Sequence, residues 1–436
     1  MLSRSVRGTR DILPEDVPLW RFVEEKARGF FSCYGYREIR TPILEYVDLF
    51  VRSLGESTDI VEKQMFVIER GEDSLVLRPE GTAGVVRAYC EHRLDVNDPV
   101  QRFFYVGPMF RGERPQKGRL RQFHQIGLEL FNVASPLGEL EIIEALVGFL
   151  NVIGLSGYTV KINSLGCEKD KLRLSDQLRS LLQGRKDDLC SVCRDRLERN
   201  VLRILDCKNE QCQSVVRSLG VLDSYLCPDC KEHYEKVKSF LSHFKVKFVE
   251  DPFLVRGLDY YSRTVFELTH PSLGEGQDTF AAGGRYDWLV NEISGGKMDI
   301  PSIGFAIGVE RLLIALAGSE KKKDMHNHFD VAVLYFPGLE IEAFSLAREI
   351  RKNGIRVLMD LTGRSIKSQM RWANRLGTRW VLILGEEEVK EENVKLKDMR
   401  QGDEIFIGMG EVVQKLRNML REKGEGLWLR GEKSNG

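Results

Sequence analysis

Residues 102–131, RFFYVGPMFRGERPQKGRLRQFHQIGLELF, decide the fold. An apolar run, a basic loop with Pro115 and Gly118, and a second apolar run predict two strands joined as a hairpin. The loop carries several arginines and lysines but a single acid, Glu113. Because arginine stays charged and grips phosphate bidentately, such a loop suits a triphosphate or an RNA end. A solvated surface hairpin is the alternative, although the apolar flanks would hold the loop over a sheet.

The composition indicates a globular protein of two or three domains. The chain has 436 residues, 42% of them hydrophobic and 30% charged. Lys+Arg and Asp+Glu both number 65, so a nucleic acid would have to be met by local basic patches. No apolar run approaches the roughly 20 residues of a membrane helix, and the polar start carries no secretory signal. With nine cysteines, an odd number, we expect reduced thiols and a cytoplasmic protein without a membrane partner.

The rest of the chain falls into segments of different character. Residues 168–250 have Lys, Arg, Glu and Leu at helical spacing and six of the nine cysteines, which predicts a mostly helical insertion. Residues 318–328, GSEKKKDMHNH, are typical of a linker. Strand-like and helical patterns then alternate from residue 330 to 420, which predicts a small α/β domain with a largely parallel sheet.

Four further motifs carry polar side chains, each with a structural alternative. LRPEGTA (77–83) places Glu80 and Thr82 in a tight turn, where an acid and a hydroxyl could hold an ammonium group. The alternative is a threonine that stabilises the turn and a solvated glutamate. LVRGLDYYSRTVFE (254–267) holds Arg256 in a strand-like run, where it binds an anion or pairs with Asp259. AAGGRYDWL (281–289) has two glycines that permit close backbone approach, or a simple turn. PSIGFAIGVERLLIAL (301–316) predicts a strand running into a helix whose Arg311 faces phosphate or solvent.

In this order the motifs resemble the class II aminoacyl-tRNA synthetases and, within them, the histidyl-tRNA synthetase family. The resemblance covers nearly the whole chain: RGTRDILPED (7–16) at the start, FRGERPQKGRLRQFHQ (110–125) as motif 2 and GFAIGVERL (304–312) as motif 3. LVRGLDYYSRTVFE and AAGGRYD are similar to the family's two histidine-specific peptides. The resemblance implies ATP-dependent ligation of L-histidine to tRNA(His) through a histidyl-adenylate, with release of AMP and pyrophosphate.

The resemblance also implies a role for each matching residue. Arg111 and Arg256 are the expected catalytic arginines at the α-phosphate, and both would also hold the histidine substrate. The remaining histidine-binding residues would be Glu80, Gly81, Thr82, Gln125, Glu129, Tyr260 and Tyr261. ATP would be bound by Arg111, Glu113, Arg119, Arg121, Phe123 and Arg311. ATP enters as a substrate with Mg²⁺, and no organic cofactor is expected.

A basic stripe in the last domain points to RNA independently. A set of basic residues recurs every three or four positions from the start of the helix predicted at 364–377, and therefore shares one face: Arg364, Lys367, Arg371, Arg375 and Arg379. No acid lies between Arg364 and Arg379, whereas a merely solvated face usually mixes both signs. We expect this face to meet RNA phosphates, and the resemblance specifies the anticodon loop.

The cysteines of the insertion leave two interpretations open. Cys190, Cys193, Cys227 and Cys230 form two CxxC pairs with the spacing of a four-thiolate zinc site, and Cys207 and Cys212 lie between them. The family that the chain resembles does not depend on zinc here, and six thiols for four places also suit plain packing. Packing thiols are the interpretation we favour from the sequence, with zinc as the alternative.

The sequence thus predicts an α/β protein with an α+β catalytic domain. Its architecture would be an antiparallel-sheet class II core (1–325) with the helical insertion, an α/β anticodon-binding domain (329–425) and a tail (426–436). The resemblance also implies a homodimer, with residues 41–54 near the interface. A non-catalytic relative, the regulatory subunit of ATP phosphoribosyltransferase, is the competing assignment; it generally lacks the last domain and has altered motif residues.

Overall fold

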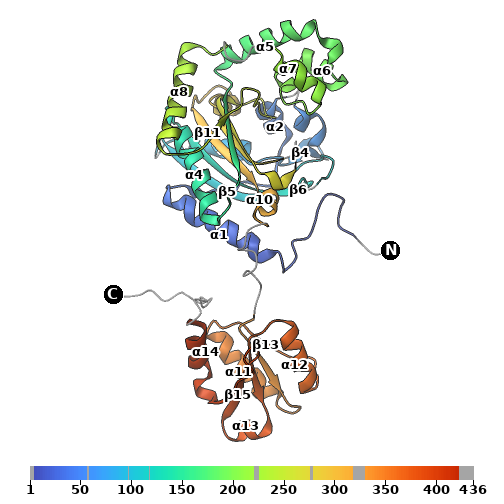
Figure 1. Cartoon of the computed structure of the whole chain (residues 1–436), viewed down its shortest axis with the longest axis vertical. Helices are drawn as coiled ribbons and strands as arrows, with labels where there is room; N and C mark the ends of the chain where they lie inside the picture. Colours follow the sequence, from blue (N-terminus) through green and yellow to red (C-terminus); the bar gives the residue numbers. More distant parts are fainter. Residues whose placement is uncertain are drawn as a thin grey trace. The chain divides into compact units, whose positions relative to one another are not determined.

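The computed structural model describes residues 4–55, 58–96, 98–116, 118–219, 225–274, 278–317 and 329–421. The chain forms two compact units, residues 1–325 and 326–436 (Figure 1). The predicted linker at 318–328, Lys117 of the basic loop and the predicted tail at 426–436 lie outside the described residues. No helix among the described residues is long and apolar enough to cross a membrane.

An eight-stranded sheet forms the centre of the first unit. The strand order is β1-β5-β6-β11-β10-β9-β7-β8, and only the two edge pairs, β1–β5 and β7–β8, are parallel. The strands are β1 (Arg37–Glu38), β5 (Gln101–Phe110), β6 (Gln122–Phe131), β7 (Thr159–Ser164), β8 (Val249–Glu250), β9 (Ser262–Thr269), β10 (Thr279–Arg285) and β11 (Ser302–Gly308). The predicted antiparallel core and its hairpin, β5–β6, are confirmed.

The alternation of side chains along β6 separates the two faces of this sheet. Ile126, Leu128 and Leu130 pack in a core with α1 (Val17–Cys33) and α4 (Leu137–Ile153), which cover that face. Because successive side chains of a strand point to opposite faces, the odd-numbered residues of β6 project to the other side. Gln125 and Glu129 are therefore directed away from the apolar core.

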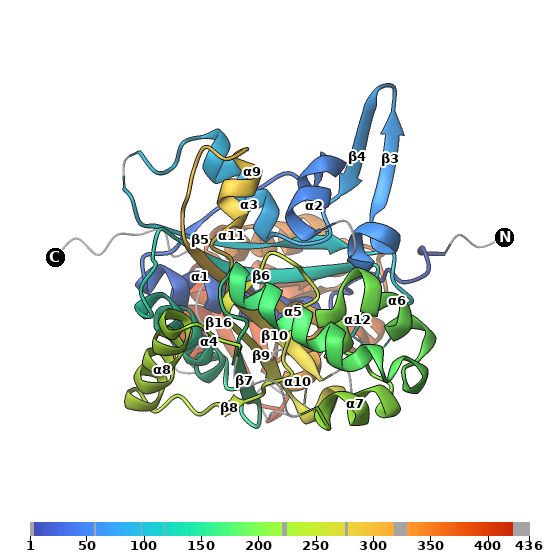
Figure 2. The same cartoon turned by 90° about the horizontal axis from the view of Figure 1, so that it is seen from above.

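A smaller layer lies over that second face. It contains a three-stranded sheet of order β2-β4-β3, whose hairpin β3–β4 projects from the unit in Figure 2. The elements of this layer are β2 (Leu44–Tyr46), α2 (Val47–Leu54), the π-helical turn η1 (Ile60–Gln64), β3 (Phe66–Arg70), β4 (Asp73–Leu77), α3 (Thr82–Glu91) and α9 (Leu289–Ile293). The remaining elements of the catalytic part are η4 (Pro271–Leu273) and α10 (Val309–Leu316).

The insertion is helical, as predicted, and α5, α6 and α7 gather at one end of the unit (Figure 1). Its elements are α5 (Glu168–Gln183), η2 (Lys186–Asp188), α6 (Ser191–Arg199), η3 (Val201–Ile204), α7 (Glu210–Arg217) and α8 (Pro228–His243). Residues 254–261, predicted as strand-like, are instead a loop that precedes β9. This loop is held by hydrogen bonds rather than by a strand ladder: Lys171 Nζ of α5 donates to the carbonyls of Asp259 and Tyr261 at 2.9 Å each.

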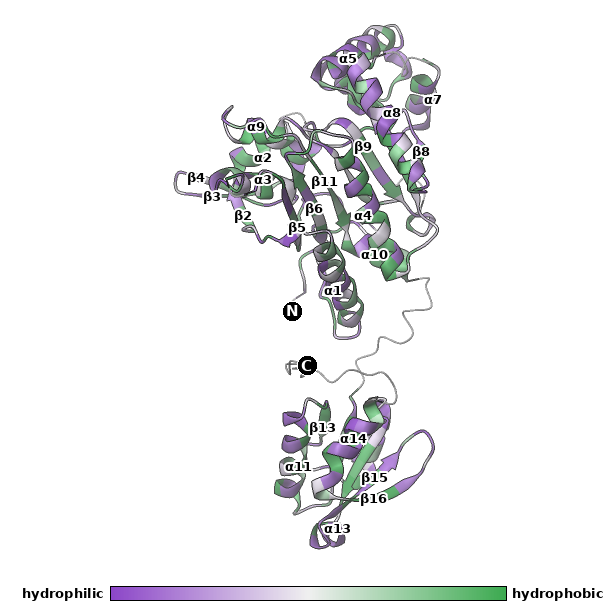
Figure 3. Cartoon of the chain, turned by 90° about the vertical axis from the view of Figure 1, so that its left-hand side faces the viewer, coloured by the Kyte–Doolittle hydropathy of each residue, from purple (hydrophilic) through white to green (hydrophobic). Residues whose placement is uncertain are grey.

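The second unit is an α/β domain with a five-stranded sheet of order β13-β12-β14-β15-β16. Its elements are β12 (Val331–Tyr335), α11 (Glu340–Lys352), β13 (Val357–Met359), α12 (Ile366–Arg375), β14 (Trp380–Leu384), α13 (Glu386–Lys390), β15 (Asn393–Asp398), β16 (Glu404–Gly408), η6 (Met409–Glu411) and α14 (Val412–Arg421). The prediction of a largely parallel sheet is wrong for half of it, because β14–β15 and β15–β16 are antiparallel. In Figure 3 the central strands are mostly hydrophobic, whereas the helices alternate in hydropathy.

Candidate active site

Glu129 lies at the centre of the polar face of β6. Its side chain is fully buried, and its carboxylate accepts hydrogen bonds from the hydroxyls of Thr82 (2.7 Å) and Tyr286 (2.5 Å). Burial raises the pKa of Glu129 to about 8, even though both hydroxyls favour the charged form. The nearby carboxylate of Glu80 adds to the rise. Such a buried acceptor is suited to bind a donor N–H from a ligand.

Glycines leave the space that this carboxylate and its neighbours occupy. Gly304 pairs with Glu129 across the β6–β11 ladder, and a Cβ on Gly304 would overlap the Glu129 carboxylate. Gly81 and Gly127 both lie against the ring of Tyr105, which a Cβ at either position would strike. The three glycines therefore allow a cluster of large polar side chains between the sheet and α3.

Glu80 and Thr82 stand at the start of α3. The carboxylate of Glu80, 3% exposed, accepts from the backbone N–H groups of Thr82 (2.7 Å) and Ala83 (2.8 Å). Burial raises the pKa of Glu80, while these hydrogen bonds and the charge of Arg111 favour ionisation. Glu80 is thus buried, not solvated, and it holds the first turn of the helix in place.

Gln125 and two tyrosines complete this pocket. The side-chain oxygen of Gln125 is buried without a hydrogen-bond partner. The rings of Tyr260 and Tyr261 lie 4.6 Å apart, and Tyr260 also packs edge-on against Tyr286 at 5.8 Å. An unsatisfied buried acceptor costs free energy, which a ligand donor would recover.

Arg111 lies at the end of β5, where the basic loop begins. Its Nε donates to the carbonyl of Pro79 at 2.9 Å, and its guanidinium lies 5.3 Å from the centroid of the Phe123 ring. Burial lowers the pKa of Arg111, and the charges of Glu113 and Glu80 oppose that change. Arg111 is therefore close to both the acidic pocket and the loop.

The basic loop folds back over the sheet. Arg119 pairs with Glu113 at 3.4 Å. Arg121 is directed elsewhere: its guanidinium donates to the carbonyls of Glu113 (3.4 Å) and Arg7 (3.3 Å). Arg121 thereby ties the loop to the N-terminal segment.

Arg311 occupies the first turn of α10, as the predicted strand-to-helix motif requires. Its guanidinium donates to the carbonyl of Thr279, while its Nε and a second terminal nitrogen are buried without partners. Burial lowers the pKa of Arg311 to about 10, and the charge of Arg119 lowers it further. Gly118 of the loop packs against this side chain, since a Cβ there would lie 3.1 Å from the Arg311 Cγ.

Arg256 does not pair with Asp259, which excludes the structural ion pair considered above. It pairs instead with Glu267 of β9, and its Nε is buried without a partner. Glu267 also accepts from the hydroxyl of Thr279 at 2.9 Å. Because Thr279 accepts from Arg311, a continuous set of contacts joins Arg256 to Arg311 through Glu267 and Thr279.

Sequence reasoning missed several of these residues. Tyr286, Gly304, Glu267 and Thr279 all lie on β9, β10 or β11, or just beyond them, and reach the site through the sheet. The sequence marks them only by position: they lie within the motifs AAGGRYDWL, LVRGLDYYSRTVFE and GFAIGVERL or directly beside them. Arg285, in AAGGRYDWL, is structural: it is fully buried and pairs with the buried Glu139, whose pKa is lowered to about 2.

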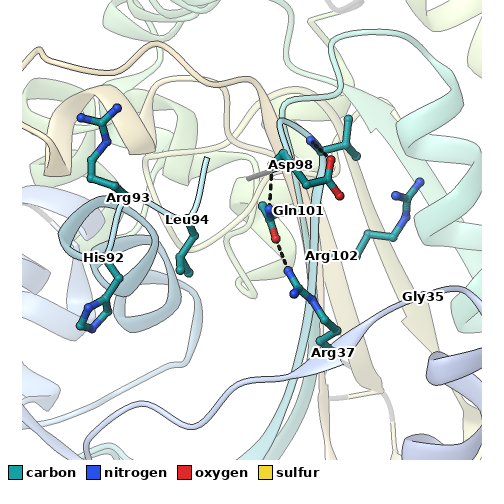
Figure 4. A pocket seen from close by; sticks show the side chains of 9 residues that line it. Gly35, Arg37, His92, Arg93, Leu94, Asp98, Gln101 and Arg102 are labelled. Atoms are coloured by element: carbon teal, nitrogen blue, oxygen red, sulfur yellow. Dashed lines mark hydrogen bonds between the residues drawn. The ribbon is translucent and has the colours of Figure 1, made fainter. Parts of the chain in front are cut away.

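A separate pocket of about 260 Å³ contains none of the predicted site residues (Figure 4). Arg37 donates there to Gln101, whose amide in turn donates to the carbonyl of Asp98 at 2.7 Å. These side chains largely satisfy one another, so the pocket contributes nothing to the site on β6.

The predicted basic stripe lies on α12, but two of its arginines are engaged. Arg364 pairs with Asp360, and Arg379 pairs with Asp398. Lys367, Arg371 and Arg375 are exposed, and the structure gives them no ion pair within its described residues. The face available to an anionic ligand therefore consists of Lys367, Arg371 and Arg375, fewer cations than the sequence predicted.

The buried side of α12 is fixed to the sheet. Ala373 packs with Ala332, Leu334 and Val381. The side chain of Gln369 is buried and bonds both backbone groups of Tyr335, accepting at 3.1 Å and donating at 2.9 Å, and also donates to the carbonyl of Arg364 at 2.7 Å.

The four cysteines considered as an alternative zinc site lie in two different clusters. Cys190 and Cys193 group with Cys207 and Cys212, whereas Cys227 and Cys230 group with Cys167 and Asp170. The structure therefore does not bring together the four cysteines of the alternative zinc site, whereas packing thiols were the interpretation favoured from the sequence. The two CxxC pairs begin different helices, α6 and α8, and each finds its neighbours elsewhere.

Comparisons with known proteins agree with this geometry. Residues 8–312 match the family model described as histidyl-tRNA synthetase, and residues 330–419 match the anticodon binding domain. Relatives called histidine–tRNA ligase include those of Halothermothrix orenii, 43% identical over 96% of this chain and 99% of the relative, and Aquifex aeolicus, 45% identical over 94% and 100%.

Solved structures give the same result. The apo histidyl-tRNA synthetase of S. aureus superposes with a TM-score of 0.77 at 32% identity, covering 95% of this chain and 100% of the other. A Bacillus halodurans protein described as an ATP phosphoribosyltransferase regulatory subunit/histidyl-tRNA synthetase has a TM-score of 0.60 at 23% identity, with 85% and 97% covered. That second likeness shows the fold alone.

Proposed function

Because the chain belongs to the histidyl-tRNA synthetase family, we propose that the cluster around Glu129 and the arginines above it form the active site of a histidine–tRNA ligase. The enzyme attaches L-histidine to tRNA(His) at the expense of ATP. The regulatory-subunit alternative has no better support, and this chain retains both the arginines and the last domain.

One observation carries the assignment of the reacting centre. Arg256 and Arg311 lie at the two ends of the contacts through Glu267 and Thr279, and each keeps buried N–H groups without partners. Phosphate oxygens are the acceptors that such fixed guanidiniums fit. In our proposal Arg311 binds the γ-phosphate and Arg256 the α-phosphate, with Arg111 between the α-phosphate and the histidine carboxylate.

The pocket below would select histidine by its polar groups. Glu80, Thr82 and Gln125 would receive the ammonium, and the unpartnered oxygen of Gln125 supports this. Glu129 and Tyr261 would bracket the two imidazole nitrogens. A side chain without these nitrogens would fill the site without making the bonds that Glu129 and Tyr261 offer the imidazole, which rejects analogues by factors of about 10⁴.

The reaction then needs no nucleophile from the protein. The histidine carboxylate attacks the α-phosphorus, pyrophosphate leaves, and a terminal ribose hydroxyl of the tRNA next attacks the adenylate carbonyl. Charge that grows on the α-phosphoryl oxygens would be stabilised by arginines already in place. Glu113 would accept from the adenine amino group and Phe123 would stack on the ring, while Arg119 and Arg121 would meet phosphates or the tRNA acceptor end. Mg²⁺ would enter with ATP as part of that substrate.

Histidine-dependent ATP–pyrophosphate exchange tests the assignment. Arg256→Ala should lower the exchange rate by about 10²–10³-fold, the cost of removing one preorganised charge stabiliser. Arg28→Ala, which removes half-buried ion pairs with Glu24 and Glu38 outside the site, is the control and should leave the rate unchanged. Full exchange activity in Arg256→Ala would remove Arg256 from the reaction, and no exchange by the unaltered enzyme would refute the function.

We also propose a cytoplasmic homodimer formed through the β2-β4-β3 layer. Leu44 and Tyr46 on β2 and Val67 and Ile68 on β3 are large apolar side chains exposed on this small sheet. Exposed apolar patches on a sheet commonly mark an interface. Tyr46→Asp should shift the sedimentation of the enzyme from dimer to monomer, and a monomeric unaltered enzyme would contradict the proposal.

A further inference from the structure

Four cysteines of the insertion converge although they come from separate turns. Cys190 precedes α6, Cys193 lies in its first turn, Cys207 follows η3 and Cys212 lies in the first turn of α7. Their four sulfur atoms all lie within 4.8 Å of one another. Cys193, Cys207 and Cys212 are buried, and all four are free thiols.

The spacing of the sulfur atoms fits a tetrahedral metal site and not a disulfide. Zinc–sulfur bonds of about 2.3 Å in a tetrahedron place sulfurs about 3.8 Å apart. The Sγ atoms of Cys190 and Cys207 are 3.9 Å apart, whereas a disulfide requires about 2.05 Å. The sequence spacings, two residues between Cys190 and Cys193 and four between Cys207 and Cys212, are those of structural zinc sites.

Backbone amides are directed at these sulfurs. The N–H of Cys190 donates to the Sγ of Cys212 at 3.2 Å, and the N–H of Asn209 donates to the Sγ of Cys207 at 3.4 Å. Donors of this kind stabilise thiolates and fix the orientation of metal ligands.

We propose that Cys190, Cys193, Cys207 and Cys212 bind one structural zinc ion. The segment that they would tie together consists of α6, η3 and α7, which are nine, four and eight residues long. Elements this short gain little from their own apolar core, and a metal supplies the missing folding free energy.

The zinc would also stabilise the loop that carries Arg256. Asn200 and Arg203 lie between the two halves of the ligand set. Asn200 donates to the carboxylate of Asp259 at 3.0 Å, and Arg203 donates to the carbonyl of Arg256 at 3.3 Å. This consequence, unlike the metal site itself, rests on the proposed role of Arg256.

The second cluster does not have the same chemistry. The two oxygens of the buried Asp170 carboxylate already accept from the backbone N–H groups of Cys227 (3.0 Å) and Cys167 (3.3 Å). Asp170 therefore serves as a cap between α5 and α8, which makes Cys227 a suitable comparison position.

Zinc content of the full-length chain, purified without chelator, tests the proposal together with Cys207→Ser and Cys227→Ser. We expect about one zinc per chain, lost in Cys207→Ser and retained in Cys227→Ser. Two zinc ions in the unaltered chain, with each variant losing one, would also support it. No zinc, zinc retained in Cys207→Ser, or one zinc that both variants lose would overturn it.

Cobalt(II) exchanged into the unaltered chain gives a measurement that does not depend on how a variant folds. Four thiolates should produce intense visible d–d bands together with a sulfur-to-cobalt charge-transfer band. The weak spectrum of octahedral cobalt would contradict the site. Because the zinc would stabilise the loop that carries Arg256, histidine-dependent pyrophosphate exchange should fall when zinc is removed. If the enzyme contains zinc but shows no exchange, the proposed function fails and the metal site stands.

Discussion

Gly304 faces Glu129 across the β6–β11 ladder, and a side chain at this position would collide with the carboxylate. The position of this acid in the pocket therefore depends on a residue 175 positions away in the sequence. The same carboxylate is held from the other side by Thr82 and Tyr286.

Gly304→Ala should displace the Glu129 carboxylate and weaken histidine binding. Overpacking of a buried site costs about 1–3 kcal/mol, so we expect the KM for histidine to rise by about tenfold or more. The KM for ATP should change little. Steady-state pyrophosphate exchange measures both constants. Gly29→Ala, in an open position on α1, is the control, and an equal rise of both constants would contradict a local effect.

Glu129→Ala should reduce histidine activation far more than ATP binding. Loss of a buried acceptor for the imidazole should lower kcat/KM for histidine by about 100-fold. Pyrophosphate-exchange titrations of each substrate separate the two effects. Equal losses for histidine and ATP would show that Glu129 supports the fold rather than the imidazole.

The stability of the ligand-free enzyme should depend on pH through Glu129. Its pKa is raised to about 8 by burial, so the folded state holds a proton that the unfolded carboxyl releases near pH 4.5. The free energy of unfolding should therefore fall as pH rises from about 4.5 to about 8 and level off above. Glu129→Gln should flatten this slope in urea unfolding at pH 5.5 and 8.5; an unchanged slope would exclude Glu129 as its source.

Replacing Arg371 and Arg375 together by Ala should weaken tRNA binding and flatten its salt dependence. The logarithm of the tRNA binding constant falls linearly with the logarithm of the salt concentration, and each lost phosphate contact makes that slope less steep by about 1. Adenylate formation should be unaffected, because these residues lie on the second unit. Arg348→Ala on α11 removes one positive charge and is the control for Arg371→Ala and Arg375→Ala taken singly. Unchanged tRNA affinity in the double variant would defeat the assignment.

The sequence predicted the elements with strong local patterns. The hairpin β5–β6 and the transition from β11 to α10 followed from apolar runs bounded by charge and glycine. β15 and β16 were missed because Lys395, Lys397 and Glu404, which lie on them, and the acidic stretch before them obscured a short alternating pattern. Their antiparallel pairing is what made the prediction of a largely parallel sheet wrong.

The site residues that escaped prediction depend on register between distant strands. No local pattern shows that Gly304 meets Glu129, or that Thr279 lies between Glu267 and Arg311. The same limit explains the cysteines: CxxC spacing identifies pairs, but only the packing of α6, α7 and α8 determines which pairs meet.

The side-chain amide of Gln369 accepts from the N–H of Tyr335 and donates to its carbonyl, the two bonds that a residue of an adjacent strand would make. These bonds anchor α12 to the sheet. Rolling the helix about its axis would break these bonds along with the bond to Arg364. Lys367, Arg371 and Arg375 consequently stand on a fixed backbone, so in their predicted role the larger adjustments of fit would come from their side chains and from the RNA.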